Sequence, residues 1–372
     1  MRYLFIDTNY SAFLDGIYRD RPELASASYE EQQAAIRAGM FGEAEFQAEA
    51  LRQLGHEAEV IVPNAYPAQQ AWAREHGVSD LVKGRWSFRR RRDIVPWLSR
   101  PRPQISWELL LEQVRVHRPD VVYVGIIGIM PSAIAARMQT LTRLLVAQVA
   151  TELPGGLDSR SYNLIVSALP SLVERFRSEG IASEWLPLAF SPAVLAEVPV
   201  LDRDIPASFV GSLGRQHPGR RELVEAVAAV TPIQIWTGDA TGLPAESPLR
   251  RLVRGPAWGR GMYEVLSRSR ITLNQHGAVA GPYAANLRLY EATGMGALLV
   301  TDAKSTLPDL FDVGAEVIVY NSPEECASLV SYYHGHPEEA SRIASAGQAR
   351  TLRDHTWHNR MGQLVSMVEA RL

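Results

Sequence analysis

The sequence predicts an α/β fold made of two doubly wound domains that face each other across a cleft. Short apolar, β-branched runs alternate with polar-apolar stretches of helical period, which is the pattern of layered α/β domains. The runs are continuously apolar, as in strands buried on both faces of a parallel sheet. With 372 residues, the chain is longer than one hydrophobic core usually serves, so two domains are expected.

The predicted strands form two series. The first lies at 2–7, 57–62, 120–125, 143–149, 162–167 and 183–188, and the second at 207–212, 233–238, 270–275, 297–302 and 316–321. Helical periodicity recurs between them at 43–54, 132–142, 219–229, 259–268 and 323–334.

The segment 188–207 separates the two series, and its prolines and weak helix signals indicate an interdomain linker. We therefore expect an N-terminal domain over 1–190 and a C-terminal domain over 205–354. In such folds, ligands bind outside the carboxyl ends of the strands.

Composition excludes few classes of protein. The formal net charge of −3 gives no whole-chain argument for binding nucleic acid. The one cysteine, Cys326, rules out an intrachain disulfide. The start, "MRYLFIDTNY", lacks signal-peptide architecture, and no apolar run approaches the roughly 20 residues that span a bilayer. We expect a cytoplasmic protein without a transmembrane segment, with peripheral membrane contact left open.

Small and basic residues follow the strand at 207–212. Gly211, Ser212, Gly214 and Arg215 precede a helix, where backbone amides, the helix N-terminus and a guanidinium favour a phosphate. The spacing matches neither the dinucleotide fingerprint nor the P-loop. An ordinary glycine-rich turn is the alternative.

A second candidate loop follows the strand at 270–275. It carries His276, and a helix is expected to begin at Ala284 with Asn286 and Arg288 in its first turns, suited to an anionic ligand. Glu291 follows about one turn later, with oxygens that suit a ribose diol. The alternative is that Arg288 and Glu291, three residues apart, pair on the helix surface.

Five blocks in this part of the chain are similar to a known family. They occur in the order "FVGSLGRQHPGRREL", "MYEVLSRSRITLNQHG", "NLRLYEATGMGALLVTD", "LPDLFDVGAEVIVYNSPEEC" and "IASAGQARTLRDHTWHNRM". The series, over about 205–370, resembles bacterial glycosyltransferases related to spore-maturation CgeB proteins, in the glycosyltransferase group 1 superfamily. No catalytic motif of that family is recognised in the first half of the chain.

The resemblance implies the GT-B fold, in which two Rossmann-like domains face each other. It also implies a nucleotide-diphosphate sugar (UDP, GDP or dTDP) in the C-terminal domain, an acceptor facing the N-terminal one, and no obligatory metal or other cofactor. Gly211 to Arg215, Asn286 and Arg288 would lie near the diphosphate, and Glu291 at the ribose. The segment 355–372 would return to the first domain.

The sequence leaves open whether the sugar is transferred with inversion or with retention at the anomeric carbon. The larger retaining group carries two glutamates seven residues apart, and here Tyr283 takes the earlier position. If the enzyme inverts, Asp7 or Asp15 in the loop after the first strand is the expected base. For Asp7 the alternative is a helix cap or turn residue. Among the histidines, His276 is the best placed for the donor phosphates.

The predicted function is therefore transfer of a sugar from a nucleotide sugar to a glycan, lipid-linked or small-molecule acceptor. The alternatives are a non-catalytic sugar-nucleotide or glycan-binding protein, and an epimerase of the same fold. No metal site is expected, since Asp202–Asp204 has the spacing of a metal motif but lies in the linker. The Arg-rich segment 83–103 is read first as a solvated loop, second as a contact for an anionic acceptor, and last as a nucleic-acid contact.

Overall fold

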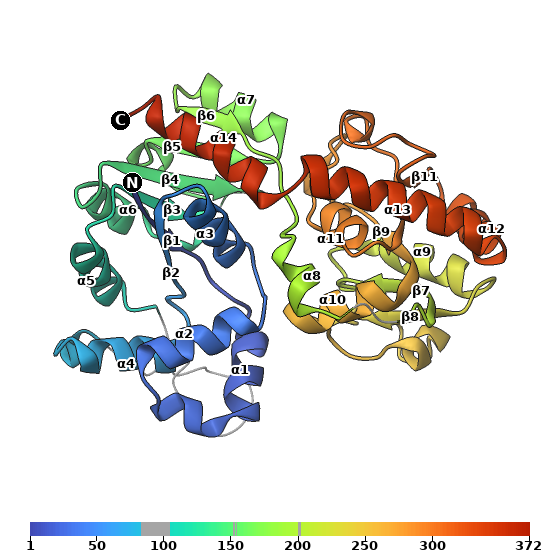
Figure 1. Cartoon of the computed structure of the whole chain (residues 1–372), viewed down its shortest axis with the longest axis horizontal. Helices are drawn as coiled ribbons and strands as arrows, with labels where there is room; N and C mark the ends of the chain where they lie inside the picture. Colours follow the sequence, from blue (N-terminus) through green and yellow to red (C-terminus); the bar gives the residue numbers. More distant parts are fainter. Residues whose placement is uncertain (83–104, 152, 154, 200–201) are drawn as a thin grey trace.

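The protein consists of two α/β domains, seen side by side in Figure 1. The computed structural model describes residues 1–82, 105–151, 153, 155–199 and 202–372, so the Arg-rich segment 83–103 lies outside the described residues. Each strand predicted from the sequence is present within two residues of the expected start. Both sheets are parallel, which confirms the predicted α/β fold class.

The first domain contains a six-stranded parallel sheet with the order β2-β1-β3-β4-β5-β6. Its strands are β1 (Arg2–Ile6), β2 (Glu57–Ile61), β3 (Val121–Val124), β4 (Leu144–Val149), β5 (Leu164–Ser167) and β6 (Ser183–Trp185). Its helices are α1 (Ser11–Asp20), α2 (Tyr29–Ala38), α3 (Ala44–Gln53), α4 (Tyr66–Glu75), α5 (Trp107–His117), α6 (Ser132–Gln139) and α7 (Pro170–Ser178). All four residues of β3 and of β5 are buried, because helices cover both faces of a parallel sheet.

The second domain contains a five-stranded parallel sheet with the order β11-β10-β9-β7-β8. Its strands are β7 (Ile205–Val210), β8 (Ile233–Trp236), β9 (Ser269–Asn274), β10 (Leu298–Asp302) and β11 (Ile318–Tyr320). Its helices are α9 (Pro218–Ala228), α10 (Gly259–Arg268), α11 (Arg288–Gly294), α12 (Pro323–Gly335) and α13 (Pro337–Asp354).

Each sheet has one place where the strand order reverses. In the first domain the chain leaves β1 for β2 on one side and returns to β3 on the other. In the second domain it leaves β7 for β8 and returns to β9. The carboxyl ends of strands at such switch points diverge and leave a crevice for a ligand. A ligand crevice is therefore expected at the ends of β1 and β3 and at the ends of β7 and β9.

Two crossings of the chain connect the domains. The first contains α8 (Ala193–Glu197), and the second leads from α13 into α14 (Trp357–Glu369), which packs against α3 of the first domain (Figure 1). The crossings bind each other, since the amide of Phe190 donates to the carbonyl of His355 (2.9 Å) and the amide of Trp357 to that of Phe190 (3.0 Å). These hydrogen bonds tie the linker to the returning helix.

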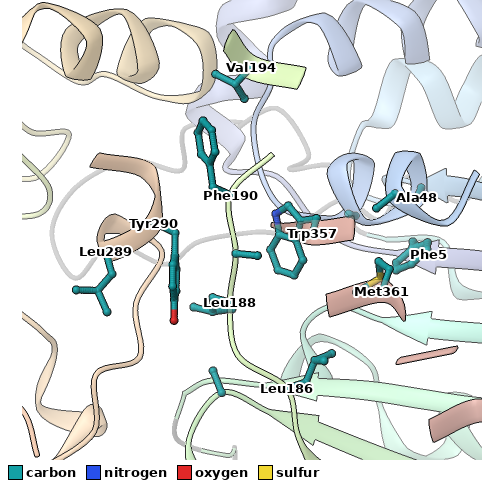
Figure 2. Packing of buried hydrophobic residues seen from close by; sticks show 14 of the residues in the cluster. Phe5, Ala48, Leu186, Leu188, Phe190, Val194, Leu289, Tyr290, Trp357 and Met361 are labelled. Atoms are coloured by element: carbon teal, nitrogen blue, oxygen red, sulfur yellow. The ribbon is translucent and has the colours of Figure 1, made fainter. Parts of the chain in front are cut away.

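One hydrophobic cluster extends through this junction. Figure 2 shows Leu188 and Phe190 of the linker between Tyr290 of α11 and Trp357 of α14. A Cβ atom on Gly294 would lie 2.5 Å from the Phe190 ring, so only glycine lets α11 approach the linker this closely. The position of α11, which carries two predicted site residues, is thus set by the packing between the domains.

No helix in the described part of the chain is long and apolar enough to cross a bilayer.

Candidate active site

A large cavity lies between the domains, at the carboxyl ends of both sheets. It has a volume of about 580 Å³, which is in the range of small-molecule sites. The first domain contributes residues that follow β1 and β3, Gln148 within β4, and the segment 40–43 before α3. The second contributes residues after β7 and β8 and the starts of α10 and α11. The cavity therefore joins the switch point of the first sheet to the carboxyl ends of β7 and β8.

Two carboxyl groups line the first-domain side. Asp7 follows β1 and accepts a hydrogen bond from the amide of Thr8 (2.8 Å). Burial raises the pKa of the Asp7 carboxyl to about 6, and the bond from Thr8 offsets only part of this effect. Burial likewise raises the pKa of Glu43, just before α3, to about 7, and the negative charges of Asp7 and Glu291 act in the same direction.

Glu43 is held by a chain of hydrogen bonds in the first domain. The hydroxyl of Tyr123 donates to Gln148 Oε1 (2.6 Å), and Gln148 Nε2 donates to Glu43 Oε2 (3.1 Å). Gln47 Nε2 lies 3.5 Å from the same oxygen. Because each group is fixed by the next, the Glu43 carboxyl has a defined position at the cleft wall.

An ion pair lines the second-domain side. Arg288 Nη1 and Glu291 Oε2 are 2.8 Å apart, with side chains 15% and 10% exposed. The pairing alternative for these two residues is thus confirmed, but the pair lies in the cleft wall and not on an open helix surface. Burial raises the pKa of Glu291, and Arg288 partly offsets this. Arg288 Nε is buried without a hydrogen-bond partner among the described residues, so this guanidinium retains a free donor.

The helix that carries this pair begins at Arg288, four residues later than expected. The amide of Ala284 instead donates to the Thr306 hydroxyl (2.9 Å). Asn286 precedes the helix, where its Oδ1 accepts from the amide of Leu289 (3.3 Å) and its Nδ2 donates to Asn274 Oδ1 (2.8 Å). Asn286 therefore fixes the start of α11 and is not among the cavity-lining residues.

The glycine-rich loop after β7 is only partly available to a ligand. Gly211 and Ser212 line the cavity, while Gly214 and Arg215 do not. The amide of Gly211 already donates to Trp236 (3.0 Å), and that of Gly214 to the Ser212 hydroxyl (3.0 Å). These two amides are thus engaged within the protein.

Arg220 lies directly behind this loop and was not singled out in the sequence. It donates to the carbonyls of Ser212 (3.1 Å) and Gln275 (3.0 Å), and its Nε is buried without a partner in the described part of the chain. Burial lowers its pKa, and the charge of Arg288 nearby acts in the same direction. Two guanidinium groups therefore lie close together at the ends of β7 and β9. The block "PGRREL" contains Arg220 beside Arg221, and no local pattern distinguishes the buried one.

Aromatic side chains form the mouth of the cleft. Tyr10, 63% exposed, lies 5.0 Å from the Phe41 ring and 6.3 Å from the Trp258 ring, so rings of both domains meet. Trp258 lies against Gly238, where an added Cβ would be 2.9 Å from the indole. Ala257 and Trp258 line the cavity at this point.

The remaining predicted residues lie outside the cavity. Asp15 is exposed on α1 and does not line it. His276 is buried, with its amide and its Nδ1 bound to Asp302 Oδ1 (3.0 and 2.7 Å). Their catalytic roles stay predictions. Glu43, Gln148 and Arg220 are the residues that the sequence did not single out.

Within the described residues, no group of three or more His, Cys, Asp or Glu side chains is arranged to hold a metal ion.

Comparison with known proteins agrees with this architecture. Residues 215–366 match a family model described as glycosyl transferase-like. No curated protein matches the sequence. Two of the similar solved structures cover 100% of this chain and 100% of their own. Anabaena Alr3699/HepE in complex with UDP and glucose is 14% identical, with a TM-score of 0.56. Sucrose-phosphate synthase from Thermosynechococcus elongatus is 12% identical, with a TM-score of 0.55. AviGT4, a glycosyltransferase involved in avilamycin A biosynthesis, is 15% identical with a TM-score of 0.53 over 98% of this chain and 96% of its own.

At these identities the structural likeness demonstrates the fold. The chain therefore has the two-domain GT-B architecture of these neighbours. The match of residues 215–366 to the glycosyl transferase-like model, together with these neighbours, supports a transferase enzyme.

Proposed function

We propose that the protein transfers a sugar from a nucleotide-diphosphate sugar to an acceptor hydroxyl. The observation that carries this proposal is the interdomain cleft itself. One wall offers the Arg288 guanidinium, with Arg220 behind it, and an aromatic ring, and the other offers two carboxyls whose pKa values burial has raised. Such a division suits a leaving diphosphate on one side and a reacting hydroxyl on the other. The five sequence blocks further support a relative of the CgeB-type glycosyltransferases.

The donor is assigned to the second domain. Arg288, with Arg220 behind Gly211, supplies positive charge where negative charge develops on the leaving diphosphate. Glu291 presents carboxylate oxygens for the ribose hydroxyls, and Trp258 offers a flat surface for the base. UDP is our first choice of nucleotide, because the HepE structures contain UDP or UDP-glucose. The guanidinium groups make a divalent cation unnecessary in this proposal.

The acceptor is assigned to the first domain, with Asp7 as the base. The acceptor oxygen attacks the anomeric carbon, the bond from that carbon to the diphosphate oxygen breaks, and the hydroxyl proton passes to the Asp7 carboxylate. With a pKa of about 6, Asp7 is mostly ionised at neutral pH and still able to accept a proton. Tyr283, which stands where retaining relatives have a glutamate, does not line the cleft. We therefore infer inversion at the anomeric carbon.

The first test is nucleotide binding. We expect UDP to raise the thermal unfolding midpoint, and GDP and dTDP to raise it less, because a ligand that binds only the folded state stabilises it. Arg288→Ala should weaken UDP binding by at least about tenfold, since it removes charge-assisted contacts and leaves Glu291 buried and unpaired. Arg268→Ala is the matched control, because Arg268 lies on α10 in an exposed pair with Asp204. Equal affinity in the two variants contradicts the donor assignment.

The second test is turnover. Incubation with UDP-glucose and without acceptor should release UDP slowly, and added EDTA should not change the rate. Binding without any turnover across UDP-, GDP- and dTDP-sugars supports a non-catalytic binding protein instead. Recovery of an epimerised sugar nucleotide supports an epimerase.

A further inference from the structure

The first-domain wall of the cleft carries unbalanced negative charge. Asp7 and Glu43 both line it, and the described residues include no ion-pair partner for either carboxylate. Glu43 is contacted by the neutral amides of Gln148 and Gln47, and Asp7 by a backbone amide. Among the described lining residues the only basic side chain is Arg288, and Glu291 already pairs with it.

Asp7 and Glu43 line the same cavity and lie near each other. Their charges interact with each other, and a Cβ on Gly42, the residue before Glu43, would lie 3.8 Å from Asp7 Oδ2. Asp7 and Glu43 are both half-buried. A carboxylate that is partly removed from water and has no cation beside it is costly, so proteins retain one mainly where it serves a ligand or a reaction. A single base is enough for hydroxyl activation, and Asp7 fills that role. The second carboxylate, Glu43, therefore requires its own explanation.

The aromatic mouth adds an independent feature. Tyr10 and Phe41 of the first domain and Trp258 of the second lie around the entrance, with rings 5.0 and 6.3 Å from the Tyr10 ring. Phe13 stacks on Phe41 at 4.6 Å and holds it in place. Aromatic faces attract cations through their quadrupoles, and together with carboxylates they are the usual surroundings of a bound ammonium group.

We propose that the acceptor carries a protonated amine, as an amino sugar or aminocyclitol does, and that Glu43 binds this ammonium group beside the aromatic mouth. The amine stays protonated and unreacted, while Asp7 takes the proton from the neighbouring hydroxyl. This inference rests on the proposed function, because it identifies the chemical class of that reaction's acceptor. It differs from the anionic acceptor that the Arg-rich segment suggested.

The experiment compares three probes that differ in one group. They are methyl 6-amino-6-deoxy-α-D-glucopyranoside, its N-acetyl derivative and methyl α-D-glucuronide, which present an ammonium, a neutral amide and a carboxylate. Dissociation constants are measured for the full chain by ligand-observed NMR at pH 8, with and without UDP. We expect the amine to bind at least about tenfold more tightly than the other two, as charged hydrogen bonds do. Glu43→Gln should abolish this preference, and Glu49→Gln, on the exposed side of α3, should keep it.

Several outcomes overturn the proposal. The first is that the wild-type protein binds the N-acetyl or carboxylate probe as tightly as the amine, or more tightly. The second is that the amine preference survives in Glu43→Gln. The third is that Mn²⁺ binds in a way that depends on Glu43 while no amine preference is found. The wild-type series is decisive even if Glu43→Gln does not fold. If UDP does not bind, the proposed function fails, while the measurements without nucleotide still decide whether the acidic wall selects an amine.

Discussion

Glu43→Gln should stabilise the protein at alkaline pH while impairing acceptor binding. The pKa of Glu43 is about 7 in the folded protein against an ordinary 4.5, so the folded state keeps a proton that the unfolded chain releases. Stability is therefore lost as pH rises from about 4.5 through about 7. From these two values the cost to folding is about 1 kcal/mol at pH 5 and about 3 kcal/mol at pH 8. Glutamine carries no charge and does not incur this cost.

The assay is urea unfolding of wild-type and Glu43→Gln proteins at pH 5, 6, 7 and 8. We expect the variant's advantage to grow by roughly 2 kcal/mol between pH 5 and pH 8, because its side chain can still bind the amide of Gln148. Glu49→Gln is the control, since Glu49 is 47% exposed and pairs with Arg52, and its effect should stay below about 0.5 kcal/mol at each pH. An advantage that is constant with pH, or a loss of stability at pH 8, refutes the burial argument.

Three further perturbations test the cleft. Asp7→Asn should lower kcat by about 100-fold or more with little change in donor affinity. In the wild-type protein, kcat should rise with pH through about 6 as Asp7 loses its proton. A kcat that the substitution leaves unchanged excludes Asp7 as the base. Trp258→Ala should weaken UDP binding by about tenfold or more, the usual effect of losing a base-stacking ring, and unchanged affinity in titration calorimetry places the base elsewhere. Gly259→Ala should lower stability by about 1–3 kcal/mol, because Gly259 has φ +50° and its Cβ would meet the carbonyl of Gly39 at 2.0 Å; an unchanged urea midpoint contradicts that contact.

The contact at Gly259 is part of the packing between the two domains at the cleft mouth. The amide of Arg260 donates to the carbonyl of Gly39 (2.9 Å), so the start of α10 binds the end of α2 directly across the mouth. The linker and the segment that leads into α14 are bound to each other at Phe190. The Arg260–Gly39 hydrogen bond thus joins the two domains at the cleft mouth. We regard this as the reason why Tyr10 and Trp258 come within ring-contact distance.

Much of the fold follows from local sequence pattern alone. A strand buried on both faces is apolar at most positions, so such a run is recognisable without knowledge of its neighbours. The alternation of runs with helical stretches then implies parallel sheets, and the linker prolines separate the two series. The spacing of Arg288 and Glu291 also anticipated their ion pair. These features depend on residues that are close together in the chain.

The chemistry of the cleft was decided only by tertiary structure. In sequence, Glu43 resembles any surface charge before a helix, and it is half-buried only because it lies in the cleft wall, where Gln148 reaches it from β4. Asp7 and Asp15 look equivalent, yet α1 begins between them and carries Asp15 to the surface. Arg288 and Glu291 would be a surface pair if α11 did not lie between the domains. The physical reason is that pKa values, burial and cavity walls arise from segments far apart in the chain, which no local period encodes.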